Sequence, residues 1–142
     1  MGVNKLVYAL FCEHQSVDAN GRNSYNGVFD GQTVAIRANP GEPKPTLPLP
    51  MPIMTRPFTL AMLLECAPNA QTCSVLIKDP NGQQIQPPAT IKLSSHPQGR
   101  HRVNINFQNG LPVLEQGNYH FEISVGRDKI GDIVLTVGIQ IL

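Results

Sequence analysis

The chain has 142 residues, eleven of them basic and ten acidic, with a net charge of +1 and only 15% charged residues. A chain of this length can bury roughly two-thirds of its unfolded surface, so it needs neither a disulfide nor a metal to fold. The low charged fraction argues against disorder, and the interspersed charges offer no basic patch to nucleic acid or an anionic membrane. We therefore expect one domain over residues 1–142 that binds neither.

The N-terminus and the cysteines indicate a cytoplasmic protein. The opening residues, "MGVNKLVYALFCEHQ", lack a small-residue cleavage site and make a poor signal peptide. The longest strongly apolar run, Leu60 to Leu64, is far too short to span a bilayer. Three cysteines, an odd number, fit reduced thiols. One pairing stays open, because a hairpin centred on residues 69–70 would place Cys66 opposite Cys73.

The first predicted elements are a strand over residues 5–16 and a return strand over residues 23–36. Between them, Asn20-Gly21 has the composition of a type I′ hairpin turn, in which both central residues adopt positive φ. Gly27 lies inside the return strand, which is typical of a bulge or of a close backbone approach. The sequence thus predicts a hairpin at the start of the chain.

The rest of the chain reads as short strands separated by turns. Asp79-Pro80-Asn81-Gly82 predicts a turn, because proline presets φ and Gly82 tolerates the left-handed region. Residues 101–109, "HRVNINFQN", alternate apolar and polar residues as a half-buried strand does. Further strands are expected over residues 58–66, 73–78, 89–94, 117–125 and 133–141. This pattern of short strands and turns predicts an all-β fold, a single antiparallel sandwich of about seven to nine strands.

The stretch "LEQGNYHF" resembles the tyrosine corner of immunoglobulin-type sandwiches, in which a tyrosine hydroxyl bonds to upstream backbone. Gly117 and Tyr119 occupy the positions of that motif. The residue two places on, which faces the core, is Phe121 where antibody domains have cysteine. We therefore expect an immunoglobulin-like sandwich without the disulfide.

The stretch "NPGEPKPTLPLPMPIMTRP", residues 39–57, has three interpretations: a linker, a polyproline ligand or an edge strand. A linker would leave about 38 residues on one side, too few for a stable domain. A polyproline ligand repeats every three residues, and Lys44 is misplaced as its basic anchor. Side chains and N–H groups of a strand alternate with period two, which favours an edge strand. The alternating residues are Leu47, Pro48, Leu49, Pro50, Met51, Pro52 and Ile53. This interpretation predicts that Leu49 and Met51 are more buried than Pro48 and Pro50.

The side chains that could act in catalysis or bind a metal form no recognisable catalytic motif. His14, His96, His101 and His120 show none of the spacings of a metal site. No nucleophile elbow or phosphate-binding glycine loop is present, so we expect no catalytic residue, no cofactor and no enzymatic activity. Asp30, after "NGVF", either contributes to a surface site at one end of the sandwich or caps a turn through nearby N–H groups.

Three segments in this order resemble a bacterial family of unknown function: "CEHQSVDANGRNSYNGVFD", "IKDPNGQQI" and "LEQGNYHFEISVGRDKIGDIVLTV". The resemblance covers nearly the whole chain apart from the region after Ile36. The chain departs from the pattern at Gln116, where proline commonly precedes the glycine. The resemblance implies a cytosolic sandwich from a bacterium or one of its phages, and it carries no catalytic residues to transfer.

The function that these observations favour is a non-enzymatic binding or structural module whose target is a protein partner or another copy of itself. The expected interaction surface comprises Asp30, Lys44, Leu47, Leu49, Met51, His96 and Arg100. One alternative is a component of a phage or injection particle. Another is a ligand- or metal-binding sandwich that uses its histidines.

Overall fold

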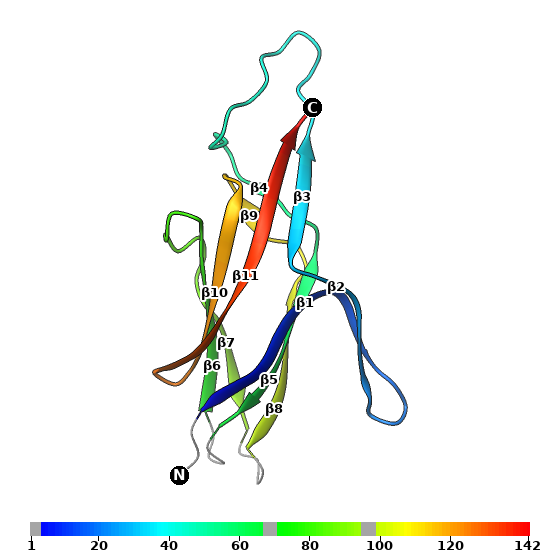
Figure 1. Ribbon diagram of the computed structural model, residues 1–142, viewed down its shortest axis with the longest axis vertical. Helices are drawn as coiled ribbons and strands as arrows, with labels where there is room; N and C mark the ends of the chain where they lie inside the picture. The colour runs from blue at the N-terminus through cyan, green and yellow to red at the C-terminus, as the bar shows by residue number, and fades with distance from the viewer. Residues whose placement is uncertain (1–3, 67–70, 95–98) are drawn as a thin grey trace.

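The computed structural model describes residues 4–66, 71–94 and 99–142 (Figure 1). These ranges hold eleven strands and no helix, and therefore no helix long and apolar enough to cross a membrane. The strands are β1 (Lys5–Val17), β2 (Asn23–Phe29), β3 (Gly31–Ile36), β4 (Ile53–Met54), β5 (Phe58–Glu65), β6 (Gln71–Lys78), β7 (Ala89–Leu93), β8 (Arg100–Phe107), β9 (Pro112–Val113), β10 (Gly117–Val125) and β11 (Asp128–Ile141). The predicted all-β fold is confirmed, and the two shortest strands explain why more than nine are found.

The strands form two large sheets and one small ribbon. The four-stranded sheet has the order β2-β1-β5-β8, the five-stranded sheet has the order β3-β11-β10-β6-β7, and β4 pairs with β9. All of these pairs are antiparallel except one: β3 runs parallel to β11. The expectation of a purely antiparallel sandwich was therefore wrong at this edge, which lies beside the C-terminal strand (Figure 1).

The chain changes sheets at Asp30. Residues 23–36 were predicted as one return strand, but β2 pairs with β1 in the four-stranded sheet and β3 pairs with β11 in the other. The N–H of Thr136 donates to the carbonyl of Asp30 at 3.0 Å, which fixes the start of the new pairing. Asp30-Gly31 directly after Phe29 indicates a kink in the strand, but it does not indicate that the chain passes to the other sheet.

The first hairpin turns differently from the prediction. Gly21 has a φ of 76°, but Asn20 does not adopt positive φ, so the turn is not type I′. Instead the carboxylate of Asp18 accepts hydrogen bonds from the N–H groups of Asn20 and Arg22, both at 2.9 Å. An aspartate that bonds to the backbone ahead of it stabilises a turn without a second left-handed residue.

Gly27 is a site of close approach and not a bulge. The register between β1 and β2 is the same on both sides of it. Its φ is +67°, and a Cβ atom there would lie 2.8 Å from Cγ of Glu13. The Glu13 side chain therefore lies over the backbone of Gly27, and any side chain at position 27 would collide with it.

The β1–β2 hairpin curls back over the outer face of the four-stranded sheet. The hydroxyl groups of Tyr8 and Tyr25 lie 2.7 Å apart, although Tyr25 pairs with Gln15, seven positions after Tyr8. Seven residues of a straight strand span about 23 Å, so this contact requires the strand to bend. Tyr8 and Leu63 are cross-strand partners, and Leu63 is buried on the face away from the core. The curled hairpin thus adds a small second layer.

The core lies between the two large sheets. Four of the five phenylalanines lie in it, and Phe29 packs against it. Phe58 and Phe107 stack with centroids 4.7 Å apart, and Phe11 meets the edge of Phe121 at 4.9 Å. Phe29 packs against the outer side of Phe11 at 6.1 Å. Aromatic pairs of this kind contribute beyond the area that they bury, so this cluster holds the two sheets together.

The tyrosine corner is confirmed. The Tyr119 hydroxyl donates to the carbonyl of Glu115 at 2.7 Å, and the Tyr119 ring is buried. Phe121 faces the core, as predicted, with 0% exposure. Gly117 has a φ of +138°, and a Cβ atom there would lie 2.8 Å from Cγ of Pro80. The start of β10 is therefore packed against Pro80 in the turn at residues 79–82.

The turn at residues 79–82 also follows the prediction. Gly82 has a φ of +83°, and its N–H donates to the carbonyl of Asp79 at 2.9 Å. The Asp79 carboxylate accepts the N–H groups of Asn81 and Gln83, both at 2.9 Å.

The proline-rich stretch does not form the predicted edge strand over residues 47–53. Only Ile53–Met54 forms a strand, which pairs with β9. Leu49 is buried with 6% exposure, as predicted, but Met51 is 74% exposed, and Pro48, Pro50 and Pro52 are exposed as well. The prediction for Met51 was therefore wrong.

The hydrogen bonds explain why Met51 points outward. The N–H of Leu49 donates to the carbonyl of Leu114 at 2.8 Å, and Ile53 pairs with Val113. The chain thus advances four residues, from Leu49 to Ile53, while its partner advances one, from Leu114 to Val113. Residues 50–52 therefore bulge away from the β4–β9 pair. Prolines have no N–H to hold such residues in a ladder, which leaves Met51 without a buried position.

Cys66 and Cys73 are not cross-strand partners. Cys66 follows β5 in the four-stranded sheet, whereas Cys73 lies in β6 of the other sheet and pairs with Ile91 and Val125. The hairpin proposed for them is therefore wrong, and its centre lies outside the described residues. All three cysteines are free and buried.

Candidate binding surfaces

The β4–β9 pair exposes an apolar surface on its outer side. Cross-strand partners share a face, so Ile53 and Val113 turn toward the core while Met54 and Pro112 turn away from it. Met51, Met54 and Leu114 are 74%, 47% and 40% exposed. We call the set Met51, Pro52, Met54, Pro112 and Leu114 the apolar ribbon.

The ribbon is fixed to the body by buried hydrogen bonds. The N–H of Thr55 donates to the carbonyl of Leu111 at 3.0 Å, and the N–H of Leu111 donates to Oγ1 of Thr55 at 2.9 Å. Gly110 has a φ of +75°, and a Cβ atom there would collide with the Thr55 carbonyl. Because these groups are buried, the backbone next to Met54 and Pro112 is held in place.

A groove of about 270 Å³ borders the ribbon. Its apolar side consists of Pro52, Ile85, Pro112 and Leu114. Its polar side comes from the turn after β6 and from the tyrosine corner, and its residues are Asp79, Gln83, Gln84, Glu115 and Tyr119. The carboxylates of Asp79 and Glu115 are the charged groups of this lining, so the groove is acidic.

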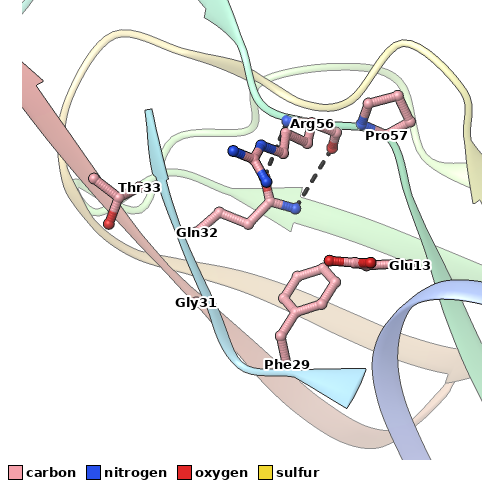
Figure 2. Close-up of a pocket in the computed structure, with 7 residues that line it drawn as sticks. All are labelled: Glu13, Phe29, Gly31, Gln32, Thr33, Arg56 and Pro57. Carbon is pink, nitrogen blue, oxygen red and sulfur yellow. Dashed lines mark hydrogen bonds between the residues drawn. The ribbon is translucent and has the colours of Figure 1, made fainter. Parts of the chain in front are cut away.

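A second concavity, of about 530 Å³, lies where the chain crosses between the sheets (Figure 2). We call it the edge cleft. Its lining residues come from β1, the β2–β3 crossing and the segment before β5, and are Glu13, Phe29, Gly31, Gln32, Thr33, Arg56 and Pro57. Figure 2 shows Glu13 beside the ring of Phe29 and Arg56 beside Gln32.

Gln32 connects the two sheets inside this cleft. Its amide oxygen accepts the N–H of Arg56 at 3.0 Å, and its amide nitrogen donates to the Arg56 carbonyl at 3.5 Å. A side-chain amide thereby takes the place of a strand neighbour for Arg56 (Figure 2). The Arg56 side chain itself remains exposed.

The structure separates the predicted interaction residues. Leu49 is buried and Leu47 half-buried against the core, so both hold the proline-rich stretch in place. Met51 lies on the apolar ribbon, and Lys44 is exposed in the loop before it. Asp30 is exposed at the crossing between sheets and lines a shallow depression beside the edge cleft.

The remaining predicted residues do not gather. His14, His101 and His120 lie on β1, β8 and β10, and His96 lies outside the described residues. Arg100 stands 3.6 Å from Glu65 in an exposed ion pair. Within the described ranges, no group of three or more histidine, cysteine, aspartate or glutamate residues is placed to hold a metal ion.

Sequence reasoning missed Met54, Leu114, Glu13 and Arg56. Met54 and Leu114 stand next to proline-rich or turn segments, and apolar residues in such places are a detectable signal. Glu13 and Arg56 had no such signal, because only the crossing at residue 30 brings them to one cleft.

The titrating groups show the effects of burial and of ion pairs. Burial raises the pKa of the Cys12 and Cys66 thiols, and burial together with the nearby Cys66 raises that of Cys73 to about 11. These thiols are therefore protonated at neutral pH and weak nucleophiles. On the outer face of the five-stranded sheet, a hydrogen bond from Lys78 lowers the pKa of Glu122.

The fold and these surfaces define a small all-β domain built from two sheets around one core, with an exposed apolar ribbon and a cleft at a sheet edge. The chain belongs to the family DUF6941, described as a family of unknown function, whose model matches residues 45–138. The apolar ribbon lies inside this range, whereas β1, β2 and β3 precede it. A search of curated proteins found no match.

Proposed function

We propose that this protein is a non-enzymatic binding module that acts through protein–protein contacts, with the apolar ribbon as its contact surface. The observation that carries the proposal is the exposure of Met54 and Leu114 on the outer side of the β4–β9 pair, with Met51 exposed in the adjacent bulge. Apolar side chains gathered on a surface and rimmed by polar residues are typical of protein interaction sites.

The chemistry of the ribbon suits this role. Methionine side chains are flexible and polarisable, so they adapt to the shape of a partner. The backbone next to Met54 is held by the Thr55–Leu111 hydrogen bonds, so binding does not have to order this part of the surface. The acidic groove beside the ribbon adds a polar rim in which Asp79 and Glu115 can meet basic groups of a partner.

The experiment begins with recovery of partners by the tagged full-length chain from the organism that encodes it. Binding of a recovered partner is then measured for the triple variant Met51→Ser, Met54→Ser, Leu114→Ser. The matched control is Val17→Ser with Val28→Ser, because both valines are 58% exposed on the distant β1–β2 hairpin. We expect the affinity of the ribbon variant to fall about tenfold or more, and that of the control to stay the same. Equal binding by all three proteins would refute the proposal.

A mass measurement in solution separates this function from particle assembly. A component of a phage or injection particle would form large rings or filaments on its own or with its partner. A binding module of the proposed kind forms a discrete complex of fixed stoichiometry.

We also infer an immunoglobulin-like arrangement and a cytoplasmic location, both as part of this proposal. The Tyr119–Glu115 bond and a parallel edge strand beside the last strand support the first. Three free cysteines in the described structure support a reducing compartment.

A further inference from the structure

We propose that the free edge of β3 binds an extended segment of a partner protein as an added strand, with a basic side chain of that segment against Glu13 and an acidic one against Arg56. This site is separate from the apolar ribbon and would be a second contact surface.

The backbone of β3 supports strand addition. Asp30 accepts a hydrogen bond from Thr136, and Ile36 accepts one from Leu142, so the even-numbered residues of this segment bond to β11. Since backbone groups of a strand alternate between its two edges, the N–H and C=O groups of Gly31, Thr33 and Ala35 point the other way. β3 is the last strand of its sheet, so these groups face its open edge.

This edge lacks the features that protect edge strands from pairing. Proteins block such edges with prolines, charged residues or bulges. The sequence of β3, "GQTVAI", contains no proline and no charge, and its register with β11 has no irregularity. Of the other edge strands, β7 follows Pro87-Pro88 and carries Lys92 and β8 carries Arg100 and Arg102, whereas β2 also lacks proline and charge.

The edge cleft gives an added strand both room and charged partners. Gly31 and Thr33 line it, so two of the outward-facing backbone positions open onto a volume of about 530 Å³. Glu13 and Arg56 line the same cleft, and within the described ranges neither takes part in an ion pair. Two unpaired opposite charges beside an open edge are complementary to a segment that carries the reverse pair.

The charges also select the occupant. A second copy of this chain would offer its own β3, whose nearest charges, Asp30 and Arg37, lie at opposite ends of the strand and seven positions apart. Glu13 lies toward β2 and Arg56 lies beside Gln32 (Figure 2), so the two charges are offset along the edge. Side chains on one face of a strand recur every second residue. Because the cleft runs along Gly31 to Thr33, the fitting segment carries a basic and an acidic residue in the short part that faces these three residues.

The probe for this proposal is a displayed library of random heptapeptides, selected on the full-length chain and in parallel on Thr33→Pro. Thr33→Pro removes an outward N–H and leaves the bonds to β11, while Thr33→Val keeps both and is the matched control. We expect peptides enriched about tenfold or more on the native chain and on Thr33→Val over Thr33→Pro, with a basic and an acidic residue close together in their sequence. Enrichment that is equal on Thr33→Pro would overturn the proposal.

Two further measurements do not depend on the folding of the proline variant. A selected peptide should slow amide hydrogen exchange at Thr33 and Ala35, whereas Val34, which bonds to β11, should not change. The double variant Glu13→Lys, Arg56→Glu should select peptides with the two charges in reversed order. Unprotected Thr33 and Ala35 amides, or no charge preference, would contradict strand addition.

Self-association and the ribbon are controlled in the same assay. If the native chain alone dimerises and protects the Thr33 and Ala35 amides, the occupant is another copy and the proposal is wrong. The ribbon variant Met51→Ser, Met54→Ser, Leu114→Ser should retain peptide binding, so this test can fail or succeed independently of the proposed function.

Discussion

Thr55 and Leu111 form a reciprocal pair of hydrogen bonds, one between their backbones and one from the Leu111 N–H to the Thr55 hydroxyl. Thr55 is 4% exposed and Leu111 is 0% exposed, so both bonds are shielded from water. This pair joins the end of the proline-rich stretch to the loop before β9. Met54 and Pro112, the outward-facing residues next to this pair, depend on it for their position.

Thr55→Val should destabilise the protein by about 1–3 kcal/mol, because the buried N–H of Leu111 loses its acceptor while the side-chain volume is kept. The free energy of unfolding from urea titration measures this effect. Thr90→Val on the exposed face of β7 is the control and should change stability little. A value for Thr55→Val equal to that of the control would show that the ribbon is held by other contacts.

Gly110→Ala should be much more harmful than Gly82→Ala. Both glycines have positive φ, +75° and +83°, so alanine carries a similar backbone cost of about 1–2 kcal/mol at each. Only at Gly110 would the new Cβ atom also collide with the Thr55 carbonyl, whereas Gly82 has open space. Thermal unfolding of the two variants compares them directly, and equal losses would rule out the close approach at Gly110.

Gln32→Met should lower the free energy of unfolding by about 1–2 kcal/mol, since two hydrogen bonds to the Arg56 backbone are lost and the length of the side chain is kept. The exposed Gln108→Met is the control. If both variants unfold at the same urea concentration, the Gln32 amide contributes nothing to holding the sheets together at this edge.

Stability should fall as the pH rises from about 9 to about 11. The Cys73 thiol has its pKa raised to about 11 in the folded state by burial and by Cys66, against 9.0 for an ordinary thiol. Above pH 9 the unfolded chain therefore loses this proton first, which favours unfolding. Urea midpoints at several pH values measure the slope. Cys73→Val should flatten it, and an unchanged slope would contradict the assignment to Cys73.

Local sequence signals predicted the parts of the fold that depend on neighbouring residues. The tyrosine corner at Tyr119, the inward position of Phe121 and the turn at Gly82 follow from short motifs. Asp30-Gly31 indicates a kink, but the change of sheet there could not be predicted, because it depends on the pairing of β3 with the distant β11. The position of Met51 depends on Leu49 pairing with Leu114, a contact that is distant in the sequence.

For the candidate surfaces too, the sequence predicts what depends on local composition and not what depends on contacts between distant residues. The proline-rich stretch was identified as unusual from its composition, and Met51 within it lies on the apolar ribbon. The edge cleft combines Glu13, Thr33 and Arg56, which are far apart in the chain and come together only through the crossing between sheets. No period or motif connects them.

Methionine oxidation by hydrogen peroxide, with mass spectrometry of the native full-length chain, measures whether the apolar ribbon is the contact surface. Met51 and Met54 are exposed and should oxidise in the free protein, while Met62, with 0% exposure, is an internal control that should not. On addition of a recovered partner, we expect the oxidation of Met51 and Met54 to slow by about tenfold or more while Met62 stays unmodified. Unchanged oxidation of Met51 and Met54 in the saturated complex would contradict the proposed function.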